Sequence, residues 1–396
     1  MTTTLEHPTT TRTQASSPSL RSVTGILEVQ EQHGFLRVNG YLPSSADLYV
    51  PADLIRRHQL RPGDLIDGVA AAGSGATGKS GQPKANPLGR VDLVNGLPPE
   101  LQRTRPRFAE LTPIHPRERL LLETGPGVAA TRAIDLLSPI GKGQRGLIVA
   151  QPKTGKTLLL QAIAKAVTRN HPECHLMVVL LDERPEEVTD MRRTVAGEVI
   201  SSTFDRPPHE HVAIAELAVE RAKRLAEQGT DVVILLDSLT RLCRAHNNSA
   251  RPGGRTLSGG VDAAAVARPK QLFGAARNLE EAGSVTILAT ALIDTGSRAD
   301  DYFFEELKST GNMELRLDRA LAERRIFPAI DIDGSGTRRE ELLVSAEELD
   351  AVRRLRRVLS AQPGTQAVEL LLERMKTTGS NAEFLQQIRR TTTPNP

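Results

Sequence analysis

The sequence contains few of the residues that mark secreted, disulfide-bonded or metal-thiolate proteins. Its 396 residues include two cysteines, Cys174 and Cys243, no tryptophan, and 3% aromatic residues. Two cysteines cannot build a disulfide framework or a thiolate metal site, and we expect both thiols to be buried structural groups. Because aromatic rings are scarce, few platforms for stacking against nucleic-acid bases are available.

The sequence also lacks a membrane segment and a secretory signal. No apolar run approaches the ~20 residues needed to span a membrane, and the Thr- and Ser-rich start, Met1–Ser17, has no apolar core. These absences predict a cytoplasmic protein without a membrane anchor. The formal net charge is +3, from 51 basic and 48 acidic residues. Because this charge is balanced, any RNA contact must come from local clusters.

The order of sequence patterns predicts two domains. Residues 1–22 have the composition of a disordered tail. From 23 to 96, short apolar stretches alternate with turn signals such as Asn39-Gly40, which predicts a small β-barrel. Residues 97–124 are rich in proline and arginine, so we expect a linker without regular structure.

Residues 125–396 have the pattern of an α/β domain. Continuous apolar runs, which indicate parallel strands buried on both faces, alternate with amphipathic helical segments. We therefore predict a doubly wound, mostly parallel sheet, followed by charged helices over about 346–390. The four runs are Gly146–Ala150, Leu176–Leu181, Val232–Leu236 and Val285–Ala289.

Two segments compete for the role of phosphate-binding loop. The pattern G-x-x-x-x-G-K-[ST] occurs at Gly73–Ser80, but no strand precedes it and two prolines follow where a helix should begin. The segment AQPKTGKT at Ala150–Thr157 lacks the first glycine, yet a strand leads into it and the helix-forming TLLLQAIAKAV follows. Because a strand and a helix together aim amide groups and the helix dipole at a phosphate, we assign the second segment. Lys156 is then expected to reach the β- and γ-phosphates, and Thr157 to hold Mg²⁺.

Acidic residues at the ends of neighbouring strands complete the pattern of an ATPase. Asp237 ends the run VVILLD, where it can organise Mg²⁺. The run before it ends in Asp182 and Glu183, and one of these carboxylates can act as general base toward the attacking water. We choose Glu183 from its position, and expect Glu186 and Glu187 to form a solvated first helical turn.

Arg338 and Arg339 follow the strand-like run RIFPAIDI, in the Gly-rich segment GSGTRREE. An exposed arginine in such a turn is either solvated or, in a ring-shaped NTPase, a finger that completes a neighbour's site. The residues alone leave both interpretations open.

Long motifs across the chain point to one family. They include GQRGLIVAQPKTGKTLLLQAIA, LLDERPEEVTDMRR, ILLDSLTRLCRAHN, GGVDAAAVARPKQLFGAARN and FPAIDIDGSGTRREELL. Together they resemble the bacterial transcription termination factor Rho family, closely over about 125–390 and more loosely over 23–96. The resemblance implies a homohexameric ring with a RecA-like motor domain, preceded by an OB- or cold-shock-like RNA-binding barrel. Such an RNA-dependent ATPase or helicase uses ATP and Mg²⁺ to pull nascent RNA from RNA polymerase and so terminates transcription.

The resemblance also implies roles for individual residues at the nucleotide. Glu183 would activate the water and Asp237 would be the acid associated with Mg²⁺. Arg338 would be the finger that reaches a neighbour's ATP, with Arg325 assisting, and Phe327 would pack against adenine. The expected nucleotide contacts are Lys153, Thr154, Gly155, Lys156, Thr157, Leu158, Arg184 and Phe327.

RNA contacts are expected in two places. Two Gly-rich basic loops, at 250–260 and 294–298, would hold the RNA backbone inside the ring. Aromatic rings of the barrel would stack on bases. The expected RNA contacts are Phe35, Tyr49, Arg255, Thr256, Ser258, Thr295 and Arg298.

The chain departs from the family's pattern mainly in the barrel. His33 stands where the family commonly has an aromatic residue, and no aromatic lies near Ala85, where another is expected. Arg255 and Arg298 stand where lysines are common, which keeps the charge but changes the geometry. Because stacking contributes ~1–3 kcal/mol per base, we expect a weaker or altered primary RNA site with an intact motor. Nanomolar binding of C-rich RNA by the isolated 1–96 fragment would contradict this expectation.

Two other functions fit parts of the sequence. A rotary ATP synthase subunit also joins a small barrel to a RecA-like domain, but it would need a larger C-terminal helical domain. An RNA-binding regulator with an inactive motor would lack Lys156, Glu183 or Asp237, and all three are present.

Overall fold

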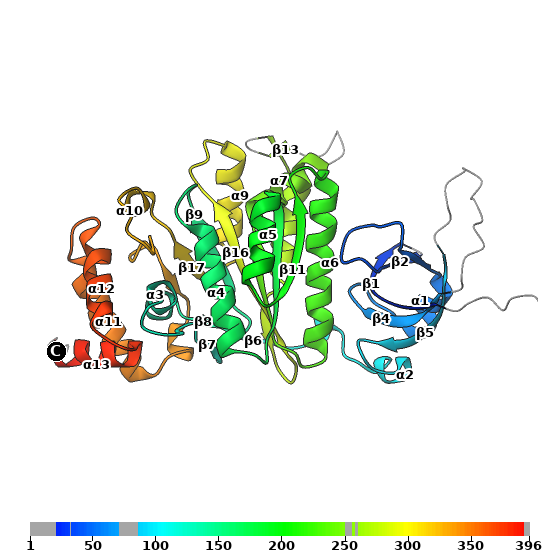
Figure 1. Ribbon diagram of the computed structural model, residues 1–396, viewed down its shortest axis with the longest axis horizontal. Coiled ribbons are helices and arrows are strands. Elements are labelled where there is room, and N and C mark those ends of the chain that lie inside the picture. The colour runs from blue at the N-terminus through cyan, green and yellow to red at the C-terminus, as the bar shows by residue number, and fades with distance from the viewer. Residues whose placement is uncertain (1–20, 32, 71–85, 250–255, 258–259, 392–396) are drawn as a thin grey trace, which may run out of the picture. The chain divides into compact units, whose positions relative to one another are not determined.

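The computed structural model describes residues 21–31, 33–70, 86–249, 256–257 and 260–391 (Figure 1). They fall into two compact units, each described by itself below. The first unit comprises the residues up to Arg103, except Gly40–Leu42 and Pro62–Asp64, which group with the second unit. The second unit otherwise begins at Thr104. In this part of the chain no helix combines the length and apolarity that crossing a membrane requires.

The first unit is a small antiparallel barrel. Its five strands lie in the order β3-β2-β1-β4-β5, and alternate side chains such as Leu27, Leu36 and Ile66 are fully buried inside. The Tyr49 amide donates to the Asn86 carbonyl at 2.9 Å, which joins β3 to the start of β5 and closes the sheet. The predicted barrel is therefore confirmed. Its elements are β1 (Arg21–Gln30), β2 (His33–Arg37), β3 (Leu48–Val50), α1 (Ala52–His58), β4 (Leu65–Ala70) and β5 (Leu88–Val94).

The second unit is built on a mostly parallel sheet. Its main path runs β11-β10-β12-β16-β9-β17-β18, and every pair from β11 to β17 is parallel. The four runs predicted as strands form β9, β10, β12 and β16, so the doubly wound α/β prediction is confirmed. The strands are β9 (Arg145–Ala150), β10 (His175–Glu183), β11 (Glu198–Thr203), β12 (Val232–Asp237), β16 (Ser284–Leu292), β17 (Met313–Arg316) and β18 (Gly336–Thr337).

Helices bury both faces of this sheet. Along β10, Val178 and Leu180 belong to the same core cluster as Leu160 of α4, and the alternate residues Met177 and Val179 are equally buried on the opposite face. Figure 1 shows α4 and α5 in front of the strands, and α6, which packs against α7, next to β11. The helices are α3 (Ala129–Leu137), α4 (Lys156–Asn170), α5 (Pro185–Thr194), α6 (Pro208–Glu227), α7 (Leu239–Ser249), α8 (Ala263–Phe273), α9 (Arg298–Lys308), α10 (Arg319–Glu323), α11 (Ala346–Ser360), α12 (Gln366–Lys376) and α13 (Asn381–Thr391).

Three local predictions are wrong. The segment 97–124 is not irregular, because prolines occupy positions that tolerate them: Pro99 is the first residue of a helix and Pro113 lies in an edge strand. The run RIFPAIDI is not a strand and contributes one bridge, because Pro328 has no N–H to donate. Cys174 is half-buried, unlike the buried Cys243. The connecting segment and the short pairs contain α2 (Pro99–Gln102), β6 (Pro113–Ile114), β7 (Arg119–Leu120), β8 (Ile140–Gly141), β13 (Thr256–Leu257), β14 (Val261–Asp262) and β15 (Arg277–Leu279).

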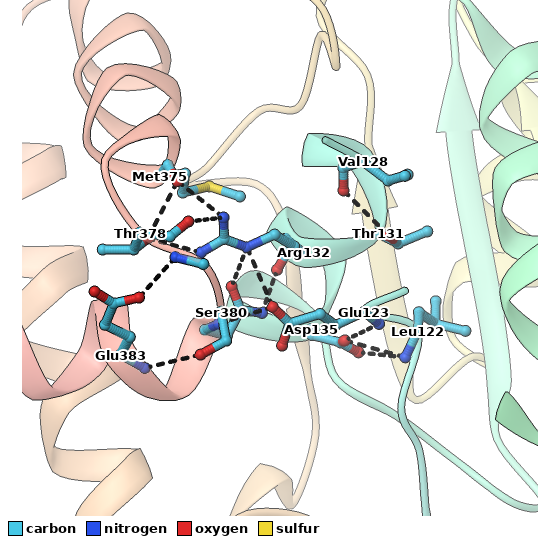
Figure 2. A network of polar contacts seen from close by, with 12 residues as sticks. Leu122, Glu123, Val128, Thr131, Arg132, Asp135, Met375, Thr378, Ser380 and Glu383 are labelled. Carbon is cyan, nitrogen blue, oxygen red and sulfur yellow. Dashed lines mark hydrogen bonds and ion pairs between the residues drawn. The ribbon is translucent and has the colours of Figure 1, made fainter. Parts of the chain in front are cut away.

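A buried arginine ties the last helices to the rest of the second unit (Figure 2). The Arg132 side chain on α3 has no exposed surface. Its guanidinium donates to the main-chain carbonyls of Met375 at 2.8 Å and Thr378 at 3.0 Å, and to the Asn381 side chain at 3.1 Å. The Glu123 carboxylate lies 3.3 Å from it. The buried charge is thus both paired and hydrogen-bonded, as burial of an ion requires.

Replacing Arg132 with methionine should destabilise the second unit strongly. The substitution keeps much of the volume but leaves the carbonyls and the Glu123 carboxylate without their donor, which costs ~3–5 kcal/mol when one partner of a buried pair is removed. The matched control is Arg389→Met, an exposed position on α13, where the change should stay within ~0.5 kcal/mol. Denaturant midpoints measure both, and equal midpoints for the two variants would contradict the assignment.

Candidate nucleotide-binding and RNA-binding sites

The segment from Ala150 to Thr157 joins the carboxyl end of β9 to the first turn of α4. Gly155 precedes the helix with φ +87°, a conformation that favours glycine, and a β-carbon there would lie 3.2 Å from the Phe327 ring. The buried Thr154 hydroxyl donates to the Gln151 carbonyl at 2.8 Å and fixes the turn. Lys153 is exposed. The strand, loop and helix thus have the arrangement of a phosphate-binding loop, whereas Gly73–Ser80 lies outside the described residues.

Lys156 lies between the two acidic residues chosen from the sequence. Its ammonium nitrogen is 2.6 Å from both Asp237 carboxylate oxygens and 3.2 Å from Glu183 Oε1. The carboxylates are 2% and 4% exposed, respectively, so each needs a cation or hydrogen-bond donor close by. The three side chains meet because β9, β10 and β12 are parallel strands of one sheet whose carboxyl ends share an edge.

A bulge in β10 determines which acid faces the lysine. The strand register shifts between Leu181 and Glu183, and Asp182 between them has φ +56°. A bulge re-aims the side chains around it. As a result Glu183 is buried beside Lys156, while Asp182 is half-exposed.

Two neighbours of these acids were missed in the sequence. Arg241 on α7 donates to Glu183 Oε1 at 2.9 Å and also to the main-chain carbonyls of Leu181 and Asp182. The buried Thr290 hydroxyl on β16 donates to Asp237 Oδ1 at 2.8 Å. The sequence contains one indication of the Arg241 contact. Arg241 follows Asp237 by four residues, which places it in the first turn of the helix that leaves the strand. These contacts hold both carboxylates in fixed positions.

Thr157 contacts an acid that was expected to be solvated. Its hydroxyl lies 3.4 Å from Glu187 Oε2, and Glu187 is half-buried, whereas Glu186 is exposed as expected. The expectation therefore fails for Glu187, because the first turn of α5 packs near the first turn of α4. Thr157 and Asp237 supply a hydroxyl and a carboxylate, which are hard oxygen ligands of the kind that Mg²⁺ takes.

An apolar cavity of about 300 Å³ adjoins the phosphate loop. Phe327 is 45% exposed and Leu158 is 70% exposed, a large apolar surface for two side chains and one that suits a flat aromatic ligand. Arg325 lies two residues before Phe327 and is exposed, as is Arg184 at the start of α5. The cavity is lined by Gly127, Val128, Ala129, Ala130, Thr154, Gly155, Leu158, Leu159, Leu317, Phe327, Pro328 and Ala329.

Arg338 lies at the other end of the strands. Met313 of β17 pairs with both Gly146 of β9 and Thr337 of β18, and the Arg338 amide donates to the Asn312 carbonyl at 2.9 Å. Arg338 is thus level with the start of β9, roughly 16 Å along the strand from Ala150, where the phosphate loop begins. It is therefore remote from its own chain's loop, and the structure does not bring it next to Arg325.

The two adjacent arginines differ in their surroundings. The Arg339 guanidinium pairs with the Glu341 carboxylate at 2.5 Å. The Arg338 side chain is exposed, and within the described residues its guanidinium has no hydrogen-bond or ion-pair partner. Arg338 is thus the arginine available to a ligand or to another chain.

The predicted RNA loops are described only in part. Thr295 donates through its hydroxyl to the buried Asp300 at 2.5 Å, and Arg298 is exposed at the first position of α9. Asp300 also accepts from Arg244, and this hydrogen bond raises the pKa of the Arg244 guanidinium. The main chain of Thr256 pairs with Asp262 in a short hairpin. Arg255 and Ser258 lie outside the described residues.

Three rings gather on β2 and β3 of the barrel. His33 stacks on Tyr49, with ring centroids 5.6 Å apart and planes 29° apart, and meets Phe35 edge-on at 5.4 Å. Phe35 and Tyr49 are cross-strand partners whose rings lie 6.2 Å apart. The Arg37 guanidinium lies 5.3 Å from the Phe35 ring. His33 therefore contributes a flat imidazole ring at the position where the family commonly has an aromatic residue. Ala85, near the second expected aromatic position, lies outside the described residues.

Comparisons with known proteins divide the chain in the same way. The model of the Rho termination factor RNA-binding domain matches residues 23–100, and that of the ATP synthase alpha/beta family nucleotide-binding domain matches residues 130–337. Proteins named transcription termination factor Rho are similar along nearly the whole chain. The one from Streptomyces coelicolor is 60% identical over 99% of this chain and 90% of its own length, and the one from Streptosporangium roseum is 58% identical over 96% of each.

Other relatives are longer, and solved structures have a similar fold over part of the chain. The chain spans 52% of a Streptomyces lividans relative and 62% of a Mycobacterium tuberculosis relative, to which it is 60% and 55% identical. A solved ATPase from a type III secretion system of pathogenic bacteria is 23% identical, with a TM-score of 0.60 over 72% of this chain and 88% of its own. That similarity supports the fold alone.

The ring cluster predicts separate losses of RNA affinity. Because stacking contributes ~1–3 kcal/mol per base, Tyr49→Ala and His33→Ala should each weaken binding of a pyrimidine-rich RNA by about 5- to 100-fold. The matched control is His58→Ala, a histidine on α1 outside the cluster, which should leave affinity unchanged. Fluorescence anisotropy with the full chain measures all three. If His33→Ala binds RNA as tightly as His58→Ala, the imidazole is not part of the platform.

Proposed function

The chain belongs to the transcription termination factor Rho family, and from this membership we propose that it is an RNA-dependent ATPase that terminates transcription. It acts in the cytoplasm as a homohexameric ring, hydrolyses ATP at subunit interfaces, and pulls nascent RNA from RNA polymerase. One observation carries the proposal: Lys156 at the phosphate loop lies within 3.2 Å of two buried carboxylates, Asp237 and Glu183. An ATPase needs these three groups together.

The residues around Lys156 have different roles in the proposed hydrolysis of ATP. Loop amides and the Lys156 ammonium bind the β- and γ-phosphates, and Lys153 adds a positive charge nearby. Glu183, held by Arg241 at 2.9 Å, orients the attacking water and accepts its proton. Leu158 and Phe327 enclose the adenine in the apolar cavity. Arg325, two residues before Phe327, is exposed and would assist in ATP hydrolysis from its own position and not from beside Arg338.

The same edge of the sheet suits magnesium. Thr157 and Asp237 would hold the ion, which supplies charge neutralisation of the phosphates. The described residues contain no group of three metal-ligating side chains, and a cation held by one carboxylate, one hydroxyl and the substrate's own phosphates needs no such group. The donor set therefore fits a Mg²⁺ ion that arrives with ATP.

The position of Arg338 supports the proposal that ATP is hydrolysed at a subunit interface. Its main chain is level with the start of β9, while the phosphate loop leaves the end of that strand. A neighbouring subunit in a ring brings its own Arg338 to the nucleotide, where the guanidinium stabilises charge that develops on the transferred phosphoryl group.

RNA binds at two places in the proposed mechanism. The ring cluster His33, Phe35 and Tyr49 holds bases of the transcript by stacking. The Gly-rich loops with Thr295 and Arg298 hold the RNA backbone in the ring. Arg255, Thr256 and Ser258 contribute to the second contact.

A rotary ATP synthase subunit explains less of the chain. The nucleotide-binding domain is common to both families, but the match over 23–100 is to an RNA-binding domain. A regulator with an inactive motor is disfavoured because the lysine and both carboxylates are in place.

Lys156→Ala tests the motor directly. RNA-stimulated ATP turnover should fall by on the order of 10²–10³, the cost of removing one group that stabilises developing charge. The matched control is Lys165→Ala, an exposed lysine on the same helix, which should retain turnover. Turnover is compared with poly(C), poly(U), single-stranded DNA and no polymer. Equal turnover by the Lys156→Ala variant and the unmodified chain, or equal turnover with and without RNA, would contradict the proposal.

Comparison of Arg338→Ala with Arg339→Ala tests which of the two adjacent arginines is the finger. Loss of the finger should lower kcat by on the order of 10³-fold or more with little change in KM for ATP. Arg339, which is engaged by Glu341, should change kcat by less than about threefold, because exposed ion pairs contribute little. Steady-state kinetics with saturating RNA measures both. A larger loss from Arg339→Ala would reverse the assignment.

A further inference from the structure

Two side chains of α11 hold the loop that carries Arg338: Ser360 donates to the Asp333 carboxylate, and Arg356 makes three further contacts. Arg356 donates through Nη1 to the carbonyls of Ile332 at 3.3 Å and Ser335 at 3.2 Å, and through Nη2 to the carbonyl of Leu137. The first two carbonyls belong to the segment that leads into Arg338. The third ends α3. One guanidinium therefore joins the loop to two helices.

Helix α11, which carries Arg356, is anchored in the core of the second unit. Ala351, Val352, Leu355 and Leu359 of α11 are buried in the core of the second unit. Its serine cap, Ser345, accepts from the Glu348 amide at 3.1 Å. Because α11 is held in place, the Arg356 side chain on it can restrict the position of the loop carbonyls that it binds.

Other contacts also hold the loop that carries Arg338. Ser335 accepts from the Arg316 amide at 2.9 Å, and Thr337 donates to the Pro139 carbonyl at 2.7 Å. The first contact attaches the loop to β17, and the second attaches it to the segment between α3 and β8. The carbonyls that Arg356 contacts precede Arg338 by three and six residues, so the loop is held by both β17 and α11.

We propose that Arg356 is a positioning residue that sets the Arg338 finger for the neighbouring subunit's nucleotide. The inference rests on the proposed function, in which Arg338 acts between subunits. Arginine suits the role because its planar guanidinium presents several donors in a fixed fork, and a lysine ammonium cannot reach three carbonyls in the same geometry. Displacing a finger by about 1 Å is enough to lower the rate by about 100-fold.

A second route exists by which Arg356 could act on ATP hydrolysis. Leu137 ends α3, and the first residues of this helix, Ala129 and Ala130, line the chain's own apolar cavity. Loss of the Leu137 contact could thus alter the cavity of the same chain. The two routes differ in which subunit's nucleotide is affected, and mixed rings distinguish them.

Kinetics of the single variants comes first. Arg356→Gln and Arg356→Lys should lower kcat by about 10- to 100-fold while KM for ATP stays within about twofold. The matched control, Arg353→Gln, makes the same change of charge at an exposed position of α11 and should keep kcat. Denaturant midpoints show whether each variant is folded. A rise in KM with unchanged kcat would overturn the inference.

Mixed rings give the deciding result. Chains with Lys156→Ala cannot hydrolyse their own ATP but present an intact finger, and chains with Arg356→Gln have an intact Lys156 site. If Arg356 acts through the finger, an equal mixture should hydrolyse ATP in a single turnover about 2- to 25-fold more than either variant alone, because roughly one interface in four pairs an intact Lys156 site with an intact finger. Absence of any gain, while a mixture of Lys156→Ala and Arg338→Ala chains does recover, would overturn the inference and leave the proposed function standing. If neither mixture recovers, hydrolysis between subunits fails, and the inference fails with it.

Discussion

Three charges at the carboxyl edge of the sheet constrain everything around them: the Lys156 ammonium and the buried carboxylates of Asp237 and Glu183. Neither carboxylate is stable in the interior without a close positive charge or donor. Lys156, Arg241 and the Thr290 hydroxyl provide these contacts. These three residues come from α4, α7 and β16. The site therefore requires both this order of strands in the sheet and the helices that follow the strands. A lysine shared by two acids is also a lysine poised to bind phosphate.

Much of this arrangement could be predicted from the sequence because its causes are local. Continuous apolar runs mark the four central strands, and a strand followed by a helix former identified the phosphate loop at Ala150 although its first glycine is missing. Asp237 followed from its place at a strand end. The remainder depends on contacts between distant segments. The bulge at Asp182 that turns Glu183 toward Lys156, and the pairing of Arg241 with Glu183, leave no periodic signal. Nor could spacing show that His33, Phe35 and Tyr49 form one cluster.

The pairing of β17 with both β9 and β18 determines where Arg338 lies relative to the phosphate loop. It places Arg338 level with the start of the strand whose end delivers the phosphate loop. One chain therefore carries a nucleotide cavity at one end of its sheet and an unengaged arginine near the other. In the proposed mechanism, this separation explains why the site is shared: a single chain has the binding half and the finger half, and cannot bring its own halves together. The side chains Arg132 and Arg356 then tie the C-terminal helices to α3 and to the finger loop.

The most direct test is a structure of the assembled chain with a hydrolysis-resistant ATP analogue, magnesium and RNA. The account predicts that Lys156 contacts the γ-phosphate and that the Arg338 guanidinium of the neighbouring subunit lies within ~2.7–3.2 Å of the same group in at least one interface. An assembly in which every Arg338 points away from all nucleotides, or in which the arginine reaches the ATP of its own chain, would contradict it.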